Sequence, residues 1–273
     1  MKLSDALQIV TRTDPGLLRS HNEDAVFGNG DLGIAILADG MGGYNAGEVA
    51  SGMATTLLST HFSQLLSRRF AQPLVAGNPR QVQKILGEQI TATNAAIYHS
   101  AQSQAQFAGM GTTLVLGWFY DNTLSVAHVG DSRLYRLRGE SFEQITHDHS
   151  LLQEQLDNGL ISPEDARHSV NKNLVTRALG VESAVDPEFN EYDVAVGDLF
   201  LLCSDGLNDM LDDAEIASTL QSCASNIHLA ADQLVQLAND KGGHDNVSVI
   251  LIKVLGDFSA RGSWWHKLLA WLK

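Results

Sequence analysis

Four aspartates in this sequence stand beside strongly apolar runs that are predicted to be buried strands: Asp39, Asp131, Asp205 and Asp245. The first three directly follow such a run, and Asp245 precedes the last one, which begins at Val247. Strand ends in a sandwich gather at the edges of the sheets, so these acids can converge if the strand directions permit it. Neighbouring carboxylates repel one another unless they are protonated or bind a cation.

The residue types favour a hard cation over zinc. Mg²⁺ and Mn²⁺ prefer oxygen ligands, whereas zinc sites typically show clusters of Cys and His. The chain has two cysteines, Cys203 and Cys223, and nothing in the sequence pairs them, so neither a disulfide nor a structural zinc site is expected. A single Asp-Gly is ordinarily a turn. Spacing alone therefore leaves two readings open, turn aspartates or an oxygen-ligand metal site.

The apolar pattern predicts helices and strands in separate blocks. Helical spacing occurs over 46–69, 82–98, 150–159, 214–220 and 227–239, and strand-like runs occur at 26–27, 32–38, 112–120, 123–129, 133–138, 199–203 and 247–254. Asn29-Gly30 suits a tight hairpin between the first two strands. The short connections at Asp121-Asn122 and Gly130-Asp131 predict a meander within one antiparallel sheet. Because the blocks do not alternate strictly, we expect an α+β fold with helices covering antiparallel sheets.

Composition narrows the class of protein. The chain has 273 residues, of which 44% are hydrophobic, and no Pro, Gly or Ser-rich linker divides it, so one domain is expected. Its formal charge of -14 argues against nucleic-acid partners. The first ten residues do not resemble an export signal, and no apolar run approaches the roughly 20 residues of a spanning helix. These features predict a cytoplasmic protein.

A series of motifs then resembles a known family. In order they are RSHNED from Arg19, ADGMGG from Ala38, GTT from Gly111, VGDSR from Val129, LCSDGL from Leu202 and DNVS from Asp245. Together they resemble the motifs of bacterial metal-dependent serine/threonine protein phosphatases of the type 2C (PPM) family. The resemblance extends from about Arg12 to Val254.

The resemblance implies a central sandwich of two antiparallel β-sheets flanked by α-helical layers. The phosphatase domain would occupy residues 1–256, with a flap subdomain at about 146–180 beside the metal site. Residues 257–273 depart from the family core and form an aromatic and basic amphipathic tail, which contains Trp264, Trp265 and Trp271. For this tail, docking on its own domain, on a partner or on a membrane surface all remain open.

The resemblance also implies a role for individual residues. Asp39 bridges two Mn²⁺ or Mg²⁺ ions, the Gly40 carbonyl and Glu23 bind one of them, and Asp205 and Asp245 bind the other. Other expected roles are a third, weaker divalent metal for Asp131, phosphate binding for Arg19, and support of the ligands for Asp24 and Asn246.

The implied reaction is hydrolysis of phosphoserine and phosphothreonine by a water held between two cations. No protein nucleophile is needed, so Cys203 is expected to be a core residue, and Ser132 and Ser204 to be turn or packing residues. Met41 stands where many eukaryotic relatives have a histidine, so the general acid is unassigned. Expected partners are phosphorylated proteins, among them a serine/threonine kinase or its targets.

Two alternatives to an active phosphatase are considered. The first is a catalytically silent phosphoprotein-binding module of the same fold, whose signature would be loss of a bridging acid. The second is a two-metal nuclease, which suits neither the motif order nor the acidic balance.

Overall fold

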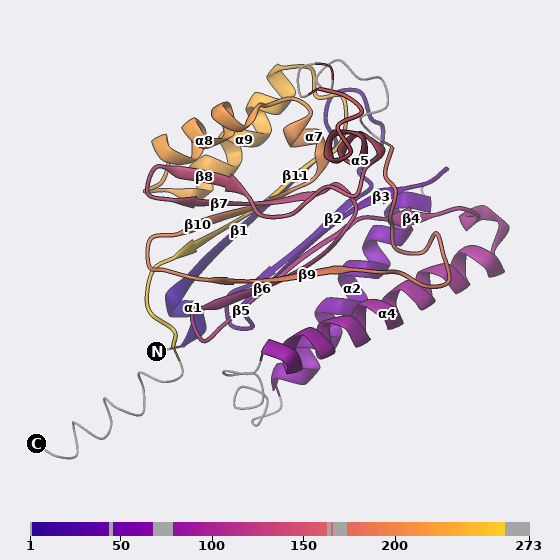
Figure 1. Ribbon diagram of the computed structural model, residues 1–273, viewed down its shortest axis with the longest axis horizontal. Coiled ribbons are helices and arrows are strands. Elements are labelled where there is room, and N and C mark those ends of the chain that lie inside the picture. Colours follow the sequence, from indigo (N-terminus) through magenta and orange to yellow (C-terminus); the bar gives the residue numbers. More distant parts are fainter. Residues whose placement is uncertain (1, 44–45, 68–78, 163–164, 166–173, 260–273) are drawn as a thin grey trace, which may run out of the picture.

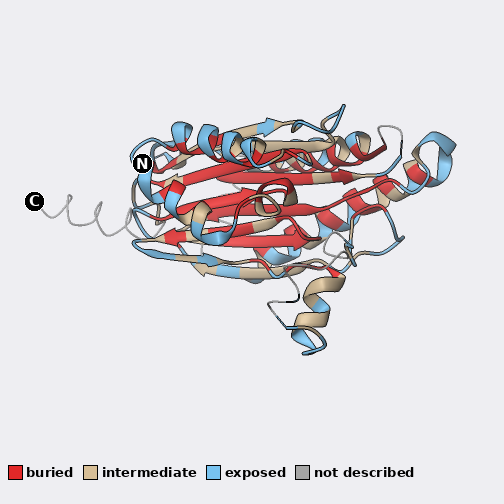
Figure 2. Ribbon diagram, turned by 90° about the horizontal axis from the view of Figure 1, so that it is seen from above, coloured by how far each residue is buried: buried red, intermediate tan, exposed pale blue. Residues whose placement is uncertain are grey.

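Two antiparallel β-sheets packed face to face form the centre of the molecule, and helices cover both outer faces (Figure 1). The computed structural model describes residues 2–43, 46–67, 79–162, 165 and 174–259. In Figure 2 the buried residues concentrate in the strands, while exposed residues lie on the outer helices and loops. This is the α+β sandwich that the sequence predicts.

The first sheet has the strand order β1-β11-β10-β7-β8. Its strands are β1 (Leu7–Asp14), β11 (Val247–Val254), β10 (Leu199–Cys203), β7 (Arg133–Arg138) and β8 (Ser141–Gln144). Its outer face packs against α8 (Asp213–Ser222) and α9 (Ile227–Asp240), the yellow and orange helices of Figure 1. Two four-residue helices accompany this sheet, α1 (Leu3–Ala6) before β1 and α7 (Asp205–Asn208) after β10.

The second sheet has the order β2-β3-β5-β6-β9, and β4 pairs with β3 beside this path. Its strands are β2 (Asp24–Asn29), β3 (Ile34–Met41), β4 (Gly111–Thr112), β5 (Leu114–Tyr120), β6 (Thr123–Val129) and β9 (Glu188–Asp193). The long helices α2 (Ala46–Ser67) and α4 (Pro79–Ser103) cover its outer face. The 3-10 turn η1 (Ala105–Phe107) follows α4, and α5 (Leu151–Asp157) follows β8.

Alternation along β3 shows how one strand serves two cores. Ile34 and Ile36 pack in the layer beneath α2 and α4, whereas Ala35 and Leu37 pack in the layer between the sheets. Successive side chains of a strand point to opposite faces, so Asp39 continues the series that faces the other sheet. The apolar layer between the sheets therefore ends in an aspartate at this end of the sandwich.

The strands at 123–129, 199–203 and 247–254 agree with the sequence prediction residue for residue. The helices at 46–69 and 82–98 are also confirmed, as Ala46–Ser67 and Pro79–Ser103. In the turn between β5 and β6, Asp121 and Asn122 have φ of 47° and 54°, the backbone that a two-residue hairpin turn requires.

The predicted meander through Gly130-Asp131 is wrong. β6 pairs with β5 and β9 in one sheet, whereas β7 pairs with β10 and β8 in the other. The chain crosses between sheets at Gly130, whose φ is 105°. A short connection at the end of a sandwich can join strands of different sheets, so its length does not reveal the pairing.

The first hairpin also differs from the prediction. The connection between β2 and β3 runs over 30–33, and positive φ occurs at Gly33 instead of at Asn29-Gly30. Asn29 uses its side-chain oxygen to accept the backbone N–H groups of Asp31 and Leu32, at 2.9 and 3.1 Å. The asparagine thus shapes the turn through its side chain.

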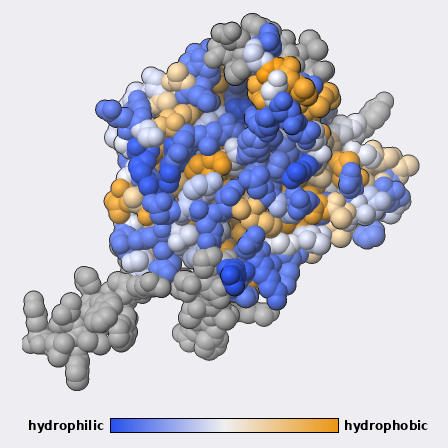
Figure 3. Space-filling view, viewed as in Figure 1, coloured by the Kyte–Doolittle hydropathy of each residue, from blue (hydrophilic) through white to orange (hydrophobic). Residues whose placement is uncertain are grey.

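No helix among the described residues is long and apolar enough to span a membrane. Hydrophilic residues dominate the face in Figure 3, with hydrophobic ones in separate patches. Of the predicted tail over 257–273, residues from 260 onward lie outside the described residues.

Candidate metal centre

Two of the predicted acids face each other across neighbouring strands. Asp24 at the start of β2 pairs directly with Asp39 near the end of β3. Side chains opposite each other in an antiparallel pair have Cβ atoms about 5 Å apart, and like charges there are destabilising. The sheet register therefore forces two carboxylates together at one end of the sandwich.

The first sheet, β1-β11-β10-β7-β8, contributes Asp205 and Asp245. Asp205 opens α7 directly after β10, and the backbone N–H of Ser204 donates to the Ser248 carbonyl at 3.1 Å, which joins this turn to β11. A Cβ on Gly206 would lie 2.1 Å from the Asn246 carbonyl oxygen. The glycine after Asp205 therefore lets the α7 turn pack against the segment that carries Asp245.

The pKa shifts show that these acids share one site. Burial raises the pKa of Asp39 well above its usual range, and the negative charges of Asp24, Asp205, Asp131 and Asp245 raise it further. Burial also raises the pKa of Asp205 well above its usual range, with added contributions from the other aspartates. The pKa of Asp24 is raised to about 7 and the pKa of Asp131 to about 6, again chiefly by burial. Clustered carboxyl groups with such raised pKa values must bind either protons or cations.

One buried oxygen lacks a partner. Asp24 Oδ2 accepts a hydrogen bond from Ser204 Oγ at 2.8 Å, but Asp24 Oδ1 is buried without any hydrogen bond. A buried polar atom without a partner calls for an explanation, and a bound ion is one of the standard ones. The donors gathered here are all oxygens, which hard divalent cations such as Mn²⁺ and Mg²⁺ prefer. The residues therefore fit the metals that the sequence implies.

Gly40 and Glu23 are held next to each other. The Gly40 N–H donates to the Glu23 carbonyl at 3.1 Å. A Cβ on Gly40 would lie 2.1 Å from the Gly47 carbonyl oxygen and 2.6 Å from that of Glu23. Because any side chain would clash here, only glycine fits, and its backbone lies next to the predicted metal ligand Glu23. Burial raises the pKa of Glu23, and Asp245 raises it further, although Arg19 opposes the shift.

Arg19 lies at the solvent edge of the acids. Its Nη2 donates to Asp245 Oδ2 at 2.6 Å, and its side chain is 53% exposed. Burial lowers its pKa, but the charges of Asp245, Glu23 and Asp205 outweigh this effect and raise it. The predicted phosphate-binding arginine is thus brought to the predicted metal ligands, with much of its guanidinium open to solvent.

Asn246 ties the segments of the site together. Its side-chain oxygen accepts the Glu23 N–H at 2.7 Å, and its amide group donates to the carbonyls of Pro15 and His21 at 3.0 and 2.9 Å. Gly16, at φ 76°, would place a Cβ 2.2 Å from the Asp245 carbonyl oxygen. The loop that carries Arg19 and Glu23 is therefore fixed against the segment that carries Asp245.

Hydroxyl groups behind the acids form a network that sequence reasoning missed. Thr113 Oγ1 accepts the Asp39 N–H at 3.0 Å, and Thr112 Oγ1 donates to the Asp39 carbonyl at 2.8 Å. Ser132 is hydrogen-bonded to Thr113 at 2.7 Å, and Ser204 donates to Asp24. The prediction of turn or packing roles for Ser132 and Ser204 is incomplete, because both also bind this network.

Asp209 is a further acid of the site. Its charge raises the pKa of both Asp205 and Asp131, and its backbone N–H donates to the Asp205 carbonyl at 2.8 Å. The signal was present in the sequence, because residues four apart lie on one face of a helical turn. Asp131 itself is 7% exposed and lies among these acids.

Cys203 has the properties of a core residue. Its side chain is fully buried in the layer beneath α8 and α9. Burial raises the pKa of its thiol to about 12, so the thiolate needed for nucleophilic attack is not available at neutral pH.

The far end of the predicted flap packs beside Asp39. Leu179 exchanges two backbone hydrogen bonds with Thr112, at 3.0 and 2.8 Å, and Thr112 in turn binds the Asp39 carbonyl. At the near end, the His149 N–H donates to the Gly130 carbonyl at 2.9 Å. Residues 163–164 and 166–173 of the predicted flap lie outside the described residues.

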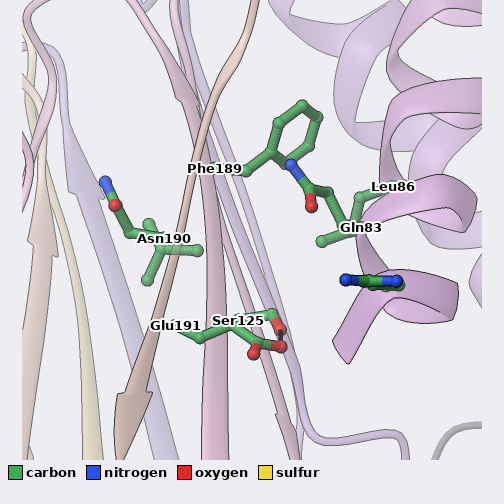
Figure 4. Close-up of a pocket in the computed structure, with 8 residues that line it drawn as sticks. Gln83, Leu86, Ser125, Phe189, Asn190 and Glu191 are labelled. Carbon is green, nitrogen blue, oxygen red and sulfur yellow. Dashed lines mark hydrogen bonds between the residues drawn. The ribbon is translucent and has the colours of Figure 1, made fainter. Parts of the chain in front are cut away.

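A separate cavity of about 100 Å³ lies between α4 and the edge of the second sheet (Figure 4). Gln83 and Leu86 line it from α4, and Ser125, Phe189 and Glu191 line it from β6 and β9. Ser125 Oγ donates to Glu191 Oε1 at 2.8 Å. This cavity shares no residue with the acid cluster.

Comparisons with known proteins identify the family to which the chain is similar. The model of the family described as protein phosphatase 2C matches residues 19–238. A serine/threonine phosphatase, Stp, from Listeria welshimeri is 40% identical over 245 residues, which cover 89% of this chain and 94% of that protein.

Solved structures agree. Serine/threonine phosphatase Stp1 from Staphylococcus aureus superposes with a TM-score of 0.82 at 35% identity, covering 94% of this chain and 98% of that one. The catalytic domain of the serine/threonine protein phosphatase PstP in complex with two manganese ions superposes with a TM-score of 0.79 at 36% identity, covering 92% and 99%. The chain therefore belongs to the protein phosphatase 2C family, and it is a protein phosphatase.

Proposed function

We propose that this protein removes phosphate from phosphoserine and phosphothreonine in cytoplasmic phosphoproteins and so opposes a serine/threonine kinase. The observation that carries the proposal is the gathering of Asp24, Asp39, Asp205 and Asp245 beside a half-exposed arginine. The pKa values of the first three acids are raised, and one buried oxygen of Asp24 has no hydrogen-bond partner. The names of the similar proteins and the two manganese ions bound by PstP support it.

Within this proposal the acids have distinct roles. Asp39 would hold both ions, the Gly40 carbonyl and Glu23 would hold one of them, and Asp205 and Asp245 would hold the other. Asp131, close enough to raise the pKa of Asp205, would hold a third and weaker ion. Mn²⁺ or Mg²⁺ pairs, when bound, lower the pKa of a shared water and neutralise charge on phosphoryl oxygens.

The side chains of the protein supply binding and orientation. The Arg19 guanidinium has five N–H donors, so it can grip phosphate oxygens while it keeps its bond to Asp245. Asn246 and the hydroxyls of Thr113 and Ser204 hold the acid-bearing segments in place. These groups are preorganised before substrate arrives, which saves the cost of ordering them during the reaction.

The reaction proceeds by direct attack of water on phosphorus, and the bond from phosphorus to the serine or threonine oxygen breaks. No protein nucleophile is required, in keeping with the buried thiol of Cys203. The departing alkoxide takes up a proton. Met41 has no proton to give, so another group of the site supplies it.

The decisive experiment measures phosphate release from a phosphothreonine peptide by the metal-stripped protein, with and without added Mn²⁺ or Mg²⁺. We expect turnover to return with metal and to disappear in an Asp39→Asn variant. If the wild type binds metal but releases no phosphate from several phosphopeptides or a small aryl phosphate, a silent phosphoprotein-binding module becomes the better account.

A further inference from the structure

Three side chains from separate segments meet at the base of the predicted flap, outside the acid cluster. His128 lies near the end of β6, His149 lies just before α5, and Glu188 is the first residue of β9. One nitrogen of each imidazole and one carboxylate oxygen all lie within 4.8 Å of one another. The two rings stack with centroids 4.6 Å apart. The group joins the start of the predicted flap, at His149, to the neighbouring strands β6 and β9.

Hydrogen bonding fixes the tautomer of His128. Its Nε2 lies 2.8 Å from the His147 carbonyl oxygen. A carbonyl can only accept, so Nε2 carries the proton and Nδ1 keeps a free lone pair. His128 is 1% exposed, and its Nδ1 has no hydrogen-bond partner. An imidazole that donates one N–H to a backbone carbonyl is oriented as metal-ligating histidines are.

His149 offers a second buried nitrogen. The side chain is 6% exposed, and Nε2 has no hydrogen-bond partner, since Glu188 Oε2 lies 3.6 Å away. Its Nδ1 accepts the Gly130 N–H at 3.2 Å. To bind a cation through Nε2, the neutral ring must move its proton to Nδ1. The Gly130 amide then loses its acceptor, which gives ligation a specific spectroscopic signature.

Charge favours cation binding at this place. Burial lowers the pKa of His128, and burial together with His128 and Arg177 lowers that of His149 to about 4. Both rings are therefore neutral at pH 7, the form that binds metals. Burial opposes ionisation of Glu188, but the hydrogen bond from Asn190 and the two histidines outweigh it and lower its pKa. The carboxylate is an anion at pH 7.

The remaining geometry supports a ligand role for Glu188. Asn190 Nδ2 donates to Glu188 Oε1 at 2.7 Å, which leaves Oε2 directed at His149. The Glu188 side chain is 38% exposed, whereas both imidazoles are buried. The carboxylate thus gives an ion a path from solvent to the two nitrogens.

We propose that His128, His149 and Glu188 form a second metal site that takes a borderline divalent cation, with Zn²⁺ preferred and a water completing the coordination. Two imidazoles and a carboxylate suit zinc, whereas the all-oxygen acid cluster suits Mn²⁺ or Mg²⁺. Tetrahedral zinc holds its ligand atoms about 3.3 Å apart, so the rings must turn and close by on the order of 1 Å. Binding clamps the start of the predicted flap to β6 and β9.

The test is a Zn²⁺ titration of the full chain with Mg²⁺ in excess, followed by calorimetry and by amide NMR. We expect saturable binding in which the Gly130 cross-peak shifts with Zn²⁺. Co²⁺ in place of Zn²⁺ should produce the intense visible absorption of four-coordinate cobalt, which oxygen-only octahedral sites lack.

Three variants make the test specific. His128→Asn and Glu188→Gln should each weaken Zn²⁺ binding at least about tenfold. Mutations of the groups around a metal typically lower metal affinity by at least this much. Glu188→Gln keeps the test valid if His128→Asn does not fold, because Glu188 is partly exposed. The matched control is His147→Gln, whose exposed ring pairs with Asp157 and whose carbonyl survives the change. The proposal is overturned if Zn²⁺ binds Glu188→Gln as tightly as wild type, or leaves the Gly130 signal unmoved.

Discussion

Asp148 and Asp39, two aspartates of this molecule, have opposite electrostatic surroundings. Asp148 receives hydrogen bonds from Arg133 Nε to both its oxygens at 3.0 Å, from Arg133 Nη2 at 2.7 Å and from Gln144 at 2.8 Å. Its side chain is 8% exposed. The fold itself supplies a cation for this acid.

Asp39, by contrast, has acids for neighbours. Burial raises the pKa of Asp39, and the charges of Asp24, Asp205, Asp131 and Asp245 each raise it further. The Arg19 guanidinium is bonded to Asp245 at the solvent edge of the cluster. The fold thus neutralises Asp148 internally but leaves the acid cluster with charge that only ions or protons from solution can offset, which distinguishes a structural acid from a functional one.

The largest expected effect comes from Asp205→Asn, which removes one charge from the cluster. We expect kcat/KM with Mn²⁺ to fall by about 10³-fold, or about 4 kcal/mol of transition-state stabilisation, because a metal ligand is weakened. The metal-free variant should be at least as stable as wild type, since a repulsive buried charge is gone. Steady-state kinetics and urea unfolding in chelator measure the two quantities.

Asp193→Asn is the control for that change, because the Asp193 side chain is 81% exposed and pairs with Arg138 away from the cluster. Its activity should stay within about twofold of wild type. If Asp193→Asn lost as much activity as Asp205→Asn, the distinction between functional and structural acids would not hold.

Arg133→Met removes the cation that pairs with Asp148, so that this acid, like Asp39, lacks an internal cationic partner. The free energy of unfolding should fall by about 3 kcal/mol, because an uncompensated charge is left buried. Arg136→Met is the control, since its partner Glu143 is 48% exposed, and it should cost less than about 1 kcal/mol. Urea unfolding with Mn²⁺ present gives both values, and similar losses would show that Asp148 does not depend on its internal partner.

The sequence predicts the elements whose burial is simple and misses those whose burial depends on neighbours. β10 and β11 are continuous apolar runs, and the sequence predicts both with their correct limits. β1 and β9 were not predicted, because their partly exposed residues include many polar ones and their positions in the sheets come from long-range pairing. The change of sheet at Gly130 was missed for the same reason.

The candidate site follows a similar rule. Asp39 and Asp205 were identified from their places at strand ends, and the family resemblance supplied their roles. That Asp24 lies opposite Asp39 follows from strand register, which local sequence does not encode. The meeting of His128, His149 and Glu188 depends on how three distant segments fold together, so no local spacing could predict it.

The stability of the metal-free protein should depend on pH through the acid cluster. Burial raises the pKa of Asp24 from 3.8 to about 7. Because the folded state binds this proton more tightly, the stabilisation is fully present below about pH 4 and is lost as pH rises through about 7.

Comparing wild type with Asp24→Asn isolates this contribution. The difference in free energy of unfolding should fall between pH 4 and 7 with a slope of up to about 1.4 kcal/mol per pH unit, the value for one proton. Urea unfolding in chelator measures it. Mn²⁺ should reverse the trend, since metal binding favours ionised ligands. A difference that stays constant with pH would show that Asp24 does not hold the proton.

The smallest effect is expected at Cys203, two residues before Asp205. The thiol is fully buried, and its pKa is raised to about 12, so Cys203→Ala removes packing but no reactive group. We expect kcat/KM within about twofold of wild type and a stability loss of about 1 kcal/mol, similar to that of Cys223→Ala, the other buried cysteine. Steady-state kinetics and urea unfolding compare the two cysteine variants.

A large activity loss confined to Cys203→Ala would point to a covalent intermediate and would contradict direct attack by water. If both variants stay active while Asp205→Asn does not, the chemistry resides in the carboxylates at the end of the strand and not in the thiol beside them.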